Sequence, residues 1–405
     1  MVTYDKSMAL RAWHQRLKRP VAAASASTAA GRASTELTRP RARPQEPSQC
    51  QTRRCRPTRP DSLFPVETSG RRTVYLDINH WYALGEAMAG HPQMPVHVDV
   101  LHQLTHLVEQ SRIMIPLSAV NYIELSENPR DHQREEAAKA MALLARFSTI
   151  TSAKKIVDEE LGLALNRMFG RPAFPIRVEK FGFGANFALT GEIKQFTLTG
   201  GTDDARRQLE AMLGMSVAEM EARVNAVSEY ELLKQPSKAY WSTIPGYDPY
   251  AARREADREL VSFNVMVNAL RTNPDLRSRP LDAIYARQLT VDIENNFVQA
   301  LLNAGYSMNR LPPLRDRESL TTLLTSMPSR RVATMLQYHY LKDSNKHWKI
   351  NDLRDNAALA MTIPYCDIVV TDSAARNTAV NHAHMGKEFG TAIFRSLTDL
   401  AAHLN

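Results

Sequence analysis

Residues 73–79 read TVYLDIN, and they give the clearest indication of the fold. Its first four side chains are β-branched, aromatic or aliphatic, which predicts a strand over Thr73–Leu76. The strand ends at Asp77, and a helical pattern of apolar residues follows from Trp81. We therefore expect an α/β fold in which this strand belongs to a central parallel sheet.

Three further short apolar runs predict the other strands of that sheet, at Arg112–Ile115, Ile368–Val370 and Thr391–Phe394. The run Ile368–Val370 is wholly apolar, as is typical of a parallel strand buried on both faces. Amphipathic stretches lie between these runs, so we expect helices on both faces of the sheet. These helices are predicted at Asp99–Gln110, from Ser118 onward, and at Asp131–Phe147, Asn351–Thr362 and Leu397–Leu404.

The middle of the chain, residues 151–345, predicts mainly helices. The clearest are Ala252–Asn273, Leu281–Asn303 and Ser329–Leu341. Lys180–Gly184 predicts a loop, and because no Gly-Lys-Ser/Thr follows it, a turn is favoured over a phosphate-binding loop. The aromatic and proline-rich stretch Trp241–Tyr250 could stack on bases, although a packed surface loop is the commoner use of such a segment.

The positive charge of the chain lies in its first part. The 405 residues carry 51 Lys and Arg against 43 Asp and Glu, a net charge of +8. Residues 1–72 hold 15 of the basic and 5 of the acidic groups, which leaves 36 and 38, a net charge of −2, for the remainder. Residues 1–70 have few large apolar side chains, which predicts disorder. A nucleic-acid-binding arm, a targeting peptide and an extension without function all remain open.

The composition excludes several classes of protein. With 43% hydrophobic residues the chain can bury a core. No apolar run reaches the roughly 18 residues that suggest a membrane span. Three cysteines do not suggest a disulfide framework, and Cys50 and Cys55 have no nearby histidine to complete a zinc site. We therefore expect a cytoplasmic protein with no membrane partner.

Acidic residues accompany the predicted transitions from strand to helix. Asp77 and Asp372 each follow a strand, and Glu124 lies on the helix after the second strand. Asp355 lies on the helix that precedes Ile368–Val370. Ligands of an open parallel sheet bind at the carboxyl ends of its strands, so these carboxylates should converge there. Clustered carboxylates repel one another unless a cation neutralises them, so we expect Mg²⁺ or Mn²⁺ at this edge.

Four motifs resemble those of PIN domains, a family of metal-dependent nucleases. LDIN at residues 76–79 resembles the family's opening Asp-x-Asn motif. SAVNYIEL at residues 118–125 resembles the second motif, with Asn121 where Thr or Ser is commoner. DNAALA at residues 355–360 is similar to the third motif, and VVTD at residues 369–372 matches the fourth. Each motif alone is weak, and their order together with the expected secondary structure makes them specific.

The resemblance implies a PIN-like three-layer fold interrupted by a large, mainly helical insertion. It covers residues 73–150 and 345–405, about a third of the chain. Glu124 and Asp355 are 231 residues apart, far more than a compact PIN domain needs. The expected organisation is therefore a basic tail, the first half of the PIN-like domain, the insertion and the second half, at residues 1–70, 71–150, 151–345 and 346–405.

The resemblance also implies a function, that of a divalent-metal-dependent nuclease and specifically an endoribonuclease. The residues expected to bind Mg²⁺ or Mn²⁺ and to carry catalysis are Asp77, Glu124, Asp355 and Asp372. Asn79 and Thr371 lie beside two of them and are expected to contact the substrate or to orient the ligands. The expected partners are RNA, with DNA as a second candidate, and a protein that docks on the helical insertion.

Two other functional classes remain open. A PIN scaffold without catalysis could bind RNA or a protein through its insertion, although the presence of all four acidic positions argues against it. A metal-dependent phosphohydrolase of another fold is disfavoured, because Asp77-Ile78-Asn79 lacks the second Asp of an aspartyl-phosphate motif. The sequence does not specify the oligomeric state.

Each of the four acidic residues also has a purely structural interpretation. Asp77 and Asp372 could cap the helices that follow them. Asp355 could simply suit the dipole of its helix, and Glu124 could pair with an arginine. For all four the metal role is favoured.

Four neighbouring residues are less specific. Asp352 shares a helix face with Asp355 and is favoured as a first-turn charge, with metal ligation as the alternative. Asp367 begins the strand that Asp372 ends, so a solvated or arginine-paired role is favoured. His80 and Trp81 could equally line the site or pack in the core.

Deletion of residues 1–70 tests the expected tail. A segment that buries almost no apolar area contributes little to stability, so the shortened protein should keep the melting temperature of the full chain. Thermal unfolding followed by circular dichroism measures this. A fall of several degrees would show that the tail packs on the folded part.

Overall fold

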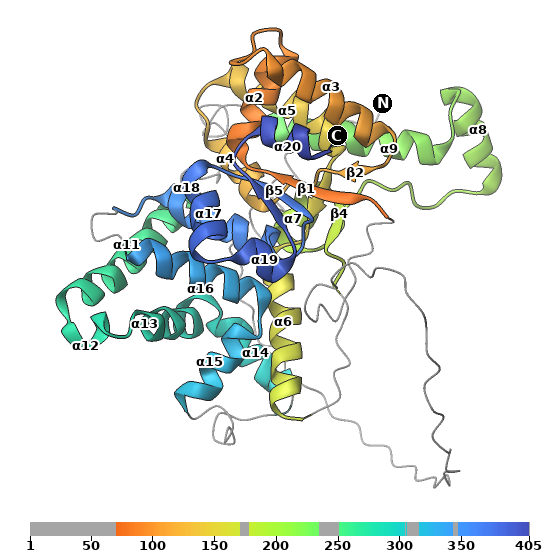
Figure 1. The fold of residues 1–405 in the computed structure, drawn as a ribbon. Coiled ribbons are helices and arrows are strands. Elements are labelled where there is room, and N and C mark those ends of the chain that lie inside the picture. The colour runs from red at the N-terminus through yellow and green to blue at the C-terminus, as the bar shows by residue number, and fades with distance from the viewer. Residues whose placement is uncertain are drawn as a thin grey trace, which may run out of the picture. The chain divides into compact units, whose positions relative to one another are not determined.

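Strand β1 (Arg72–Leu76) lies at the centre of a four-stranded parallel sheet (Figure 1). It pairs with β2 (Ile113–Met114) on one side and with β5 (Ile368–Val370) on the other. β6 (Ala392–Phe394) pairs with β5, which gives the order β2-β1-β5-β6. All four predicted strands and their parallel arrangement are thus confirmed.

The structure is a computed structural model that describes residues 70–170, 178–234, 251–303, 305, 316–342 and 347–404. The predicted tail, apart from Gly70, lies outside the described residues, and so does the aromatic stretch Trp241–Tyr250. No described helix is long and apolar enough to cross a membrane.

Apolar side chains cover the sheet on both faces, as predicted. Val74 and Leu76 of β1 point into one buried cluster and Tyr75 into another. The first cluster is formed with α2 (Ile78–Met88), α3 (Val96–Glu109), α4 (Ala119–Glu127), α5 (Asp131–Ala145) and α20 (Leu397–Leu404). The second is formed with α16 (Pro328–Leu341), α17 (Ile350–Thr362), α18 (Ser373–Asn377), the π-helical η4 (Thr378–His382) and α19 (Met385–Phe389).

A second, two-stranded sheet corrects one prediction. Lys180–Gly184 was expected to form a loop, but β4 (Phe181–Phe183) pairs antiparallel with β3 (Ser148–Ile150). The partner strand is remote in sequence, so no local pattern indicates the pairing. An isolated parallel bridge joins Leu117 to β3, because the backbone N–H of Leu117 donates to Ser148 O at 2.9 Å and that of Ile150 donates to Leu117 O at 2.8 Å.

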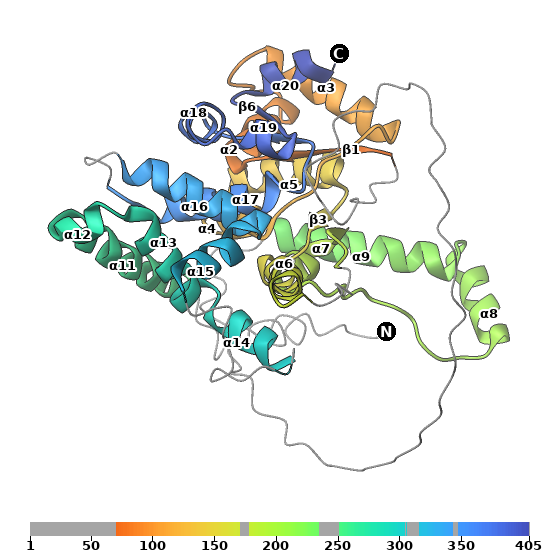
Figure 2. The same cartoon turned by 60° about the horizontal axis from the view of Figure 1, so that its bottom comes forward.

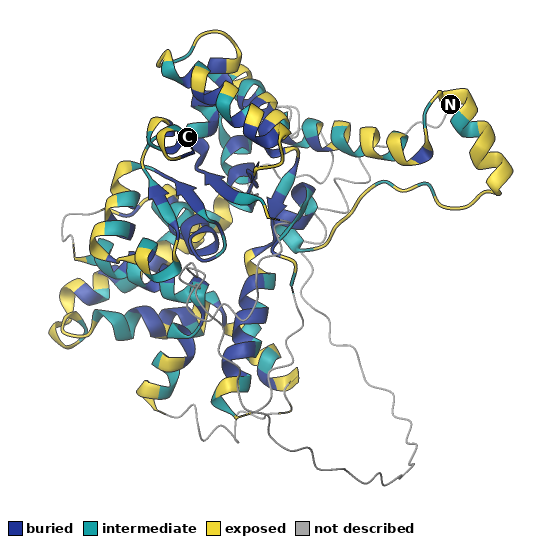
Figure 3. Ribbon diagram, turned by 45° about the vertical axis from the view of Figure 1, so that its right-hand side comes forward, coloured by how far each residue is buried: buried dark blue, intermediate teal, exposed yellow. Residues whose placement is uncertain are grey.

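In the described part of residues 151–345, the elements other than β4 are helices. Figure 2 shows α11, α12, α13 and α15 on the same side of the molecule as α16, and Figure 3 shows α8 largely exposed to solvent. These helices are α6 (Ala153–Met168), α7 (Gly184–Thr190), α8 (Asp203–Leu213), α9 (Val217–Lys234), α11 (Ala251–Thr272), α12 (Pro274–Arg277), α13 (Pro280–Arg287), η1 (Gln288–Asp292), α14 (Glu294–Asn303) and α15 (Arg317–Thr325).

The helix predicted over Leu281–Asn303 is interrupted by the π-helical turn η1. This turn places the buried Gln288 amide against α16, where its Nε2 donates to Thr334 Oγ1 at 2.9 Å. It also lets Arg287 pair with Asp292. These polar partners lie on other turns or other helices, so apolar periodicity alone predicts one continuous helix.

Gly85 tests the close packing of α2 on α5. A Cβ at this position would lie 2.7 Å from the backbone N of Ala137 and from the backbone C of Glu136, which cannot move aside as a side chain can. We expect Gly85→Ala to destabilise the fold by about 1–3 kcal/mol. Gly162→Ala in α6 is the matched control, since nothing lies within 4 Å of its Cβ and alanine favours a helix by roughly 0.5–1 kcal/mol. Urea unfolding of both variants measures the difference, and equal stability would contradict the packing.

Candidate metal centre at the carboxyl edge of the sheet

Asp77 is fixed at the point where β1 passes into α2. Its backbone N–H donates to Val370 O at 3.0 Å and so continues the pairing of β1 with β5. Its Oδ1 accepts from the backbone N–H of Ile78 at 2.7 Å and caps α2. Burial and the nearby charge of Asp372 raise the pKa of Asp77 to about 6, although the Ile78 hydrogen bond opposes the shift.

Asp372 occupies the equivalent place after β5. The preceding Thr371 is buried, and its backbone N–H donates to Phe394 O of β6 at 3.1 Å. Asp372 Oδ1 accepts from the backbone N–H groups of Ala374 at 2.6 Å and Ala375 at 2.9 Å, so it caps α18. The two aspartates therefore follow adjacent strands, as predicted, and both also cap helices.

Glu124 projects from α4 without a hydrogen-bond partner for its buried Oε2 among the described residues. The helix begins at Ser118, where Ser118 and Asn121 form a capping box that fixes its direction. Burial raises the pKa of Glu124 to about 8, and the charges of Asp77 and Asp355 add to this shift. A carboxyl group in this environment holds its proton at neutral pH unless a cation replaces it.

Asp355 lies in the second turn of α17 and contributes its charge to the same group of carboxylates. The adjacent Arg354 forms two hydrogen bonds of 2.7 Å with the carboxylate oxygens of Glu127 on α4. This pair joins α17 to α4. The positive charge of Arg354 lowers the pKa of Glu124, but burial and the charges of Asp77 and Asp355 raise it by more.

The charges of the four carboxylates act on two tyrosines, Tyr75 and Tyr340. The Tyr75 hydroxyl is fully buried 3.2 Å from Ser118 Oγ, and its pKa is raised by burial and then by Asp77, Glu124 and Asp355. Burial raises the pKa of Tyr340 to about 12, to which the charges of Asp372, Asp355 and Asp352 contribute. The structure thus brings the predicted carboxylates into one electrostatic neighbourhood.

The geometry of the neighbourhood is open rather than closed around an ion. Among the described residues, no three Asp, Glu, His or Cys side chains stand at the spacing that would hold a metal. Asp77 and Asp372 cap their helices through Oδ1, so Oδ2 of each carboxylate takes no part in the cap. Carboxylate oxygens are the donors that Mg²⁺ and Mn²⁺ prefer. The residues therefore fit such an ion in type and charge, although their present arrangement does not enclose one.

The remaining predicted residues lie around this centre. Asn79 is exposed in the first turn of α2. Asp352 Oδ2 accepts from the backbone N–H of Lys349 at 2.7 Å, so it serves as a first-turn cap of α17, as favoured from the sequence. Asp367 lies at the other end of β5, where Oδ2 accepts from Thr73 N at 2.8 Å and Thr73 Oγ1 at 2.9 Å. Its partner is thus a threonine, and not only solvent or an arginine.

His80 belongs to the centre and Trp81 to the core. His80 Nε2 is buried without a partner among the described residues, and burial lowers its pKa to about 4, although Thr371 and Asp372 oppose the shift. Trp81 is fully buried and its Nε1 donates to Leu76 O at 3.1 Å. Tyr75, Tyr340 and Arg354 were not anticipated. Arg354 stands beside Asp355 in the third motif, whereas no sequence signal marks Tyr340.

No protein-family model, no curated protein and no solved structure matches the chain. The resemblance to PIN domains therefore rests on the four motifs and on the places that the sheet gives them.

The raised pKa of Glu124 predicts how the metal-free protein depends on pH. An unfolded glutamate ionises near 4.5, whereas the native carboxyl keeps its proton to about pH 8. The contribution of Glu124 to the free energy of unfolding is therefore fully present below pH 4.5 and is lost as the pH rises toward 8. A native pKa that lies one pH unit above the unfolded pKa corresponds to about 1.4 kcal/mol, so the loss is on the order of a few kcal/mol. Asp77 adds to it between about 3.8 and 6.

Glu124→Gln should flatten this dependence, because the amide has nearly the same size and does not titrate. Urea unfolding in EDTA between pH 5 and 8 measures the slope, with the exposed Glu318→Gln as the matched control. We expect the control to keep the slope of the parent chain. An unchanged slope in Glu124→Gln would show that this carboxyl is not held protonated.

Proposed function

We propose that this chain is a divalent-metal-dependent nuclease whose ion is held by Asp77, Glu124, Asp355 and Asp372. The observation that carries the proposal is the buried carboxyl of Glu124. Its Oε2 has no hydrogen-bond partner among the described residues, and the charges of Asp77 and Asp355 act on it. Burying such a group is costly. A divalent cation offsets this cost, because it neutralises the repulsion and coordinates the free oxygen.

The arrangement of the sheet supports a PIN-like three-layer fold. Two parts of the chain far apart in sequence build one parallel sheet with helices on both faces. The acidic residue of each motif lies near the carboxyl edge of that sheet. The helical segment between α5 and α17 then corresponds to the proposed insertion.

The side chains of the centre have distinct tasks in this proposal. A bound Mg²⁺ or Mn²⁺ would supply Lewis acidity and lower the pKa of a water for phosphodiester hydrolysis. Asp77 and Asp372 hold their positions because each is anchored to a helix N-terminus. Glu124 gives up a proton when it ligates, which favours binding at higher pH. Burial keeps His80 neutral at physiological pH, and its Nε2 has no hydrogen-bond partner among the described residues.

RNA is the proposed substrate, with DNA as the second candidate. The chain after residue 72 carries a net charge of −2, so contacts to phosphates would come from local groups of Arg and Lys or from the basic residues 1–72. A non-catalytic PIN scaffold that binds RNA or a protein is the alternative function. Cleavage distinguishes the two functions. The nuclease cleaves nucleic acid and needs the four carboxylates to do so, whereas the scaffold only binds.

Replacement of Asp77 or Asp372 by asparagine tests the nuclease. Asparagine caps a helix as well as aspartate does, so the fold should persist while the ligand charge is lost. We expect Asp77→Asn and Asp372→Asn to abolish cleavage of labelled RNA or DNA of the same sequence in Mn²⁺ or Mg²⁺. EDTA should abolish it in the parent chain.

Asp203→Asn is the matched control, because Asp203 is an exposed residue in the first turn of α8. It should cleave like the parent chain. Mn²⁺ should also raise the melting temperature of the parent chain and of the control, and that of the two other variants much less. Full cleavage by either of those variants, or cleavage undiminished by EDTA, would remove the nuclease and leave the binding scaffold.

A further inference from the structure

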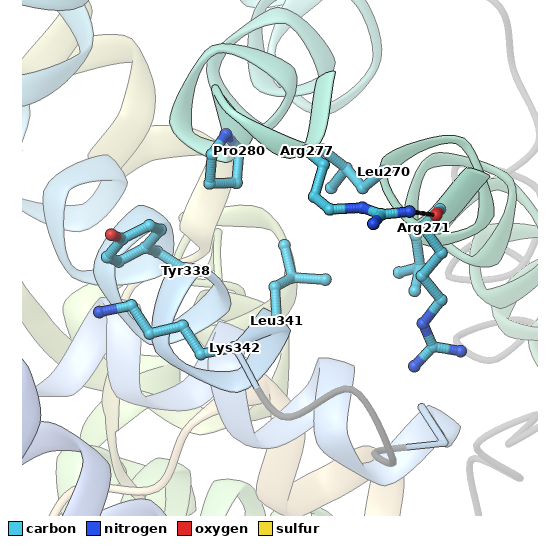
Figure 4. Close-up of a pocket in the computed structure, with 8 residues that line it drawn as sticks. Leu270, Arg271, Arg277, Pro280, Tyr338, Leu341 and Lys342 are labelled. Carbon is cyan, nitrogen blue, oxygen red and sulfur yellow. Dashed lines mark hydrogen bonds between the residues drawn. The ribbon is translucent and has the colours of Figure 1, made fainter. Parts of the chain in front are cut away.

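A pocket of about 460 Å³ opens between α11, α12, α13 and α16, outside the acidic centre (Figure 4). The described residues that line it include three cations, Arg271 of α11, Arg277 of α12 and Lys342 at the end of α16, and no carboxylate is among those described residues. Figure 4 shows Tyr338 and Lys342 on one side, the two arginines on the other and Leu341 between them. The pocket thus combines positive charge with apolar and aromatic surface.

The cations stand at the solvent side of the pocket, and all three are exposed. The Arg277 guanidinium donates to the backbone carbonyl of Arg271, which holds the two arginines together. Lys342 Nζ lies 4.4 Å from the centre of the Tyr338 ring, so the ammonium and the ring form one surface. The nearby carboxylate of Asp282 pairs with another arginine, outside the pocket. The three charges are therefore placed to meet an anion from solvent.

This combination fits one nucleotide better than a bare anion or an apolar ligand. Phosphate oxygens match the guanidinium and ammonium donors. The ring of Tyr338, Leu341 beside it and the buried Leu270 add aromatic and apolar surface to the lining, against which a base can stack. Stacking accepts any base, so the pocket would select nucleic acid without selecting sequence.

A series of ring contacts runs from this pocket toward the acidic centre. Tyr338 contacts His339 edge to face at 5.3 Å, and His339 stacks on His382 of η4 at 5.8 Å. The segment α18–η4 follows directly from Asp372. Tyr340 lies on the same turn of α16, and the charges of Asp372 and Asp355 contribute to its raised pKa. The last turn of α16 thus links the cationic pocket to the proposed metal centre.

We propose that this pocket binds one nucleotide of a single-stranded nucleic acid, and that a neighbouring part of the same strand reaches the acidic centre. The second clause rests on the proposed nuclease function. The first depends only on the cations and the tyrosine ring. RNA and DNA share the recognised chemistry of phosphate and base.

Fluorescence anisotropy of the full chain in EDTA measures binding without cleavage, with labelled twelve-residue oligouridylate and oligothymidylate as the two probes. The double variant Arg271→Glu/Arg277→Glu and the single variant Lys342→Glu should each weaken binding of at least one probe about tenfold or more and reduce its dependence on salt. Tyr338→Ala should weaken it at least about fivefold, and Tyr338→Phe should retain it, because the ring face persists. The probe that binds more tightly identifies the nucleic acid.

Arg207→Glu is the matched control, since Arg207 is an exposed residue of α8. It should bind like the parent chain. Variants of the pocket that bind both probes as tightly as the control, or a parent chain that binds neither probe, would overturn the proposal. Weakened binding in a chain that never cleaves would keep the pocket and remove the nuclease. Unweakened binding in a chain that does cleave would remove the pocket alone.

Discussion

The parallel pairing of β1 with β5 determines where the acidic residues lie. It aligns residues 74–76 with residues 368–370, so Asp77 and Asp372 follow neighbouring strands although 295 residues separate them in the chain. Both strands are buried on both faces. A shift of one residue would exchange the side chains that face the two apolar clusters, so the register is firmly determined. The position of the acidic centre follows from that register.

The same arrangement concentrates negative charge at one edge of the sheet. Backbone N–H groups stabilise some of these carboxylates more than others. Asp77 receives a backbone N–H at the start of α2, which partly offsets its burial, and its pKa rises only to about 6. Glu124 lies in the middle of a helix, where no free N–H is available, and its pKa rises to about 8. Of these two carboxyls, Glu124 receives less stabilisation from the protein, so a bound cation would stabilise its ionised form more.

The elements that the sequence predicts correctly are those specified by local patterns. The apolar runs gave all four strands of the main sheet, and the serine cap at Ser118 gave the start of α4. Phe181–Phe183 was missed because its partner strand is remote and its glycine suggests a turn. Within the centre, the aspartates at strand ends could be anticipated from the sheet. Tyr340 could not be, because only the packing of α16 on α17 brings it there.

The long helical segment between the motifs takes part in the centre. Tyr340 of α16 lies within the charge of Asp372 and Asp355, and Arg253 of α11 approaches Glu127 to 3.9 Å, where Arg354 already forms its bidentate pair. Helices of this segment thus help to position α4 and α17, which carry two of the carboxylates. A segment that only covered the sheet would not need charged contacts at this edge. The packing of this helical segment therefore affects the distance between Glu124 and Asp355. A metal ion bound by both carboxylates would require that distance to be short.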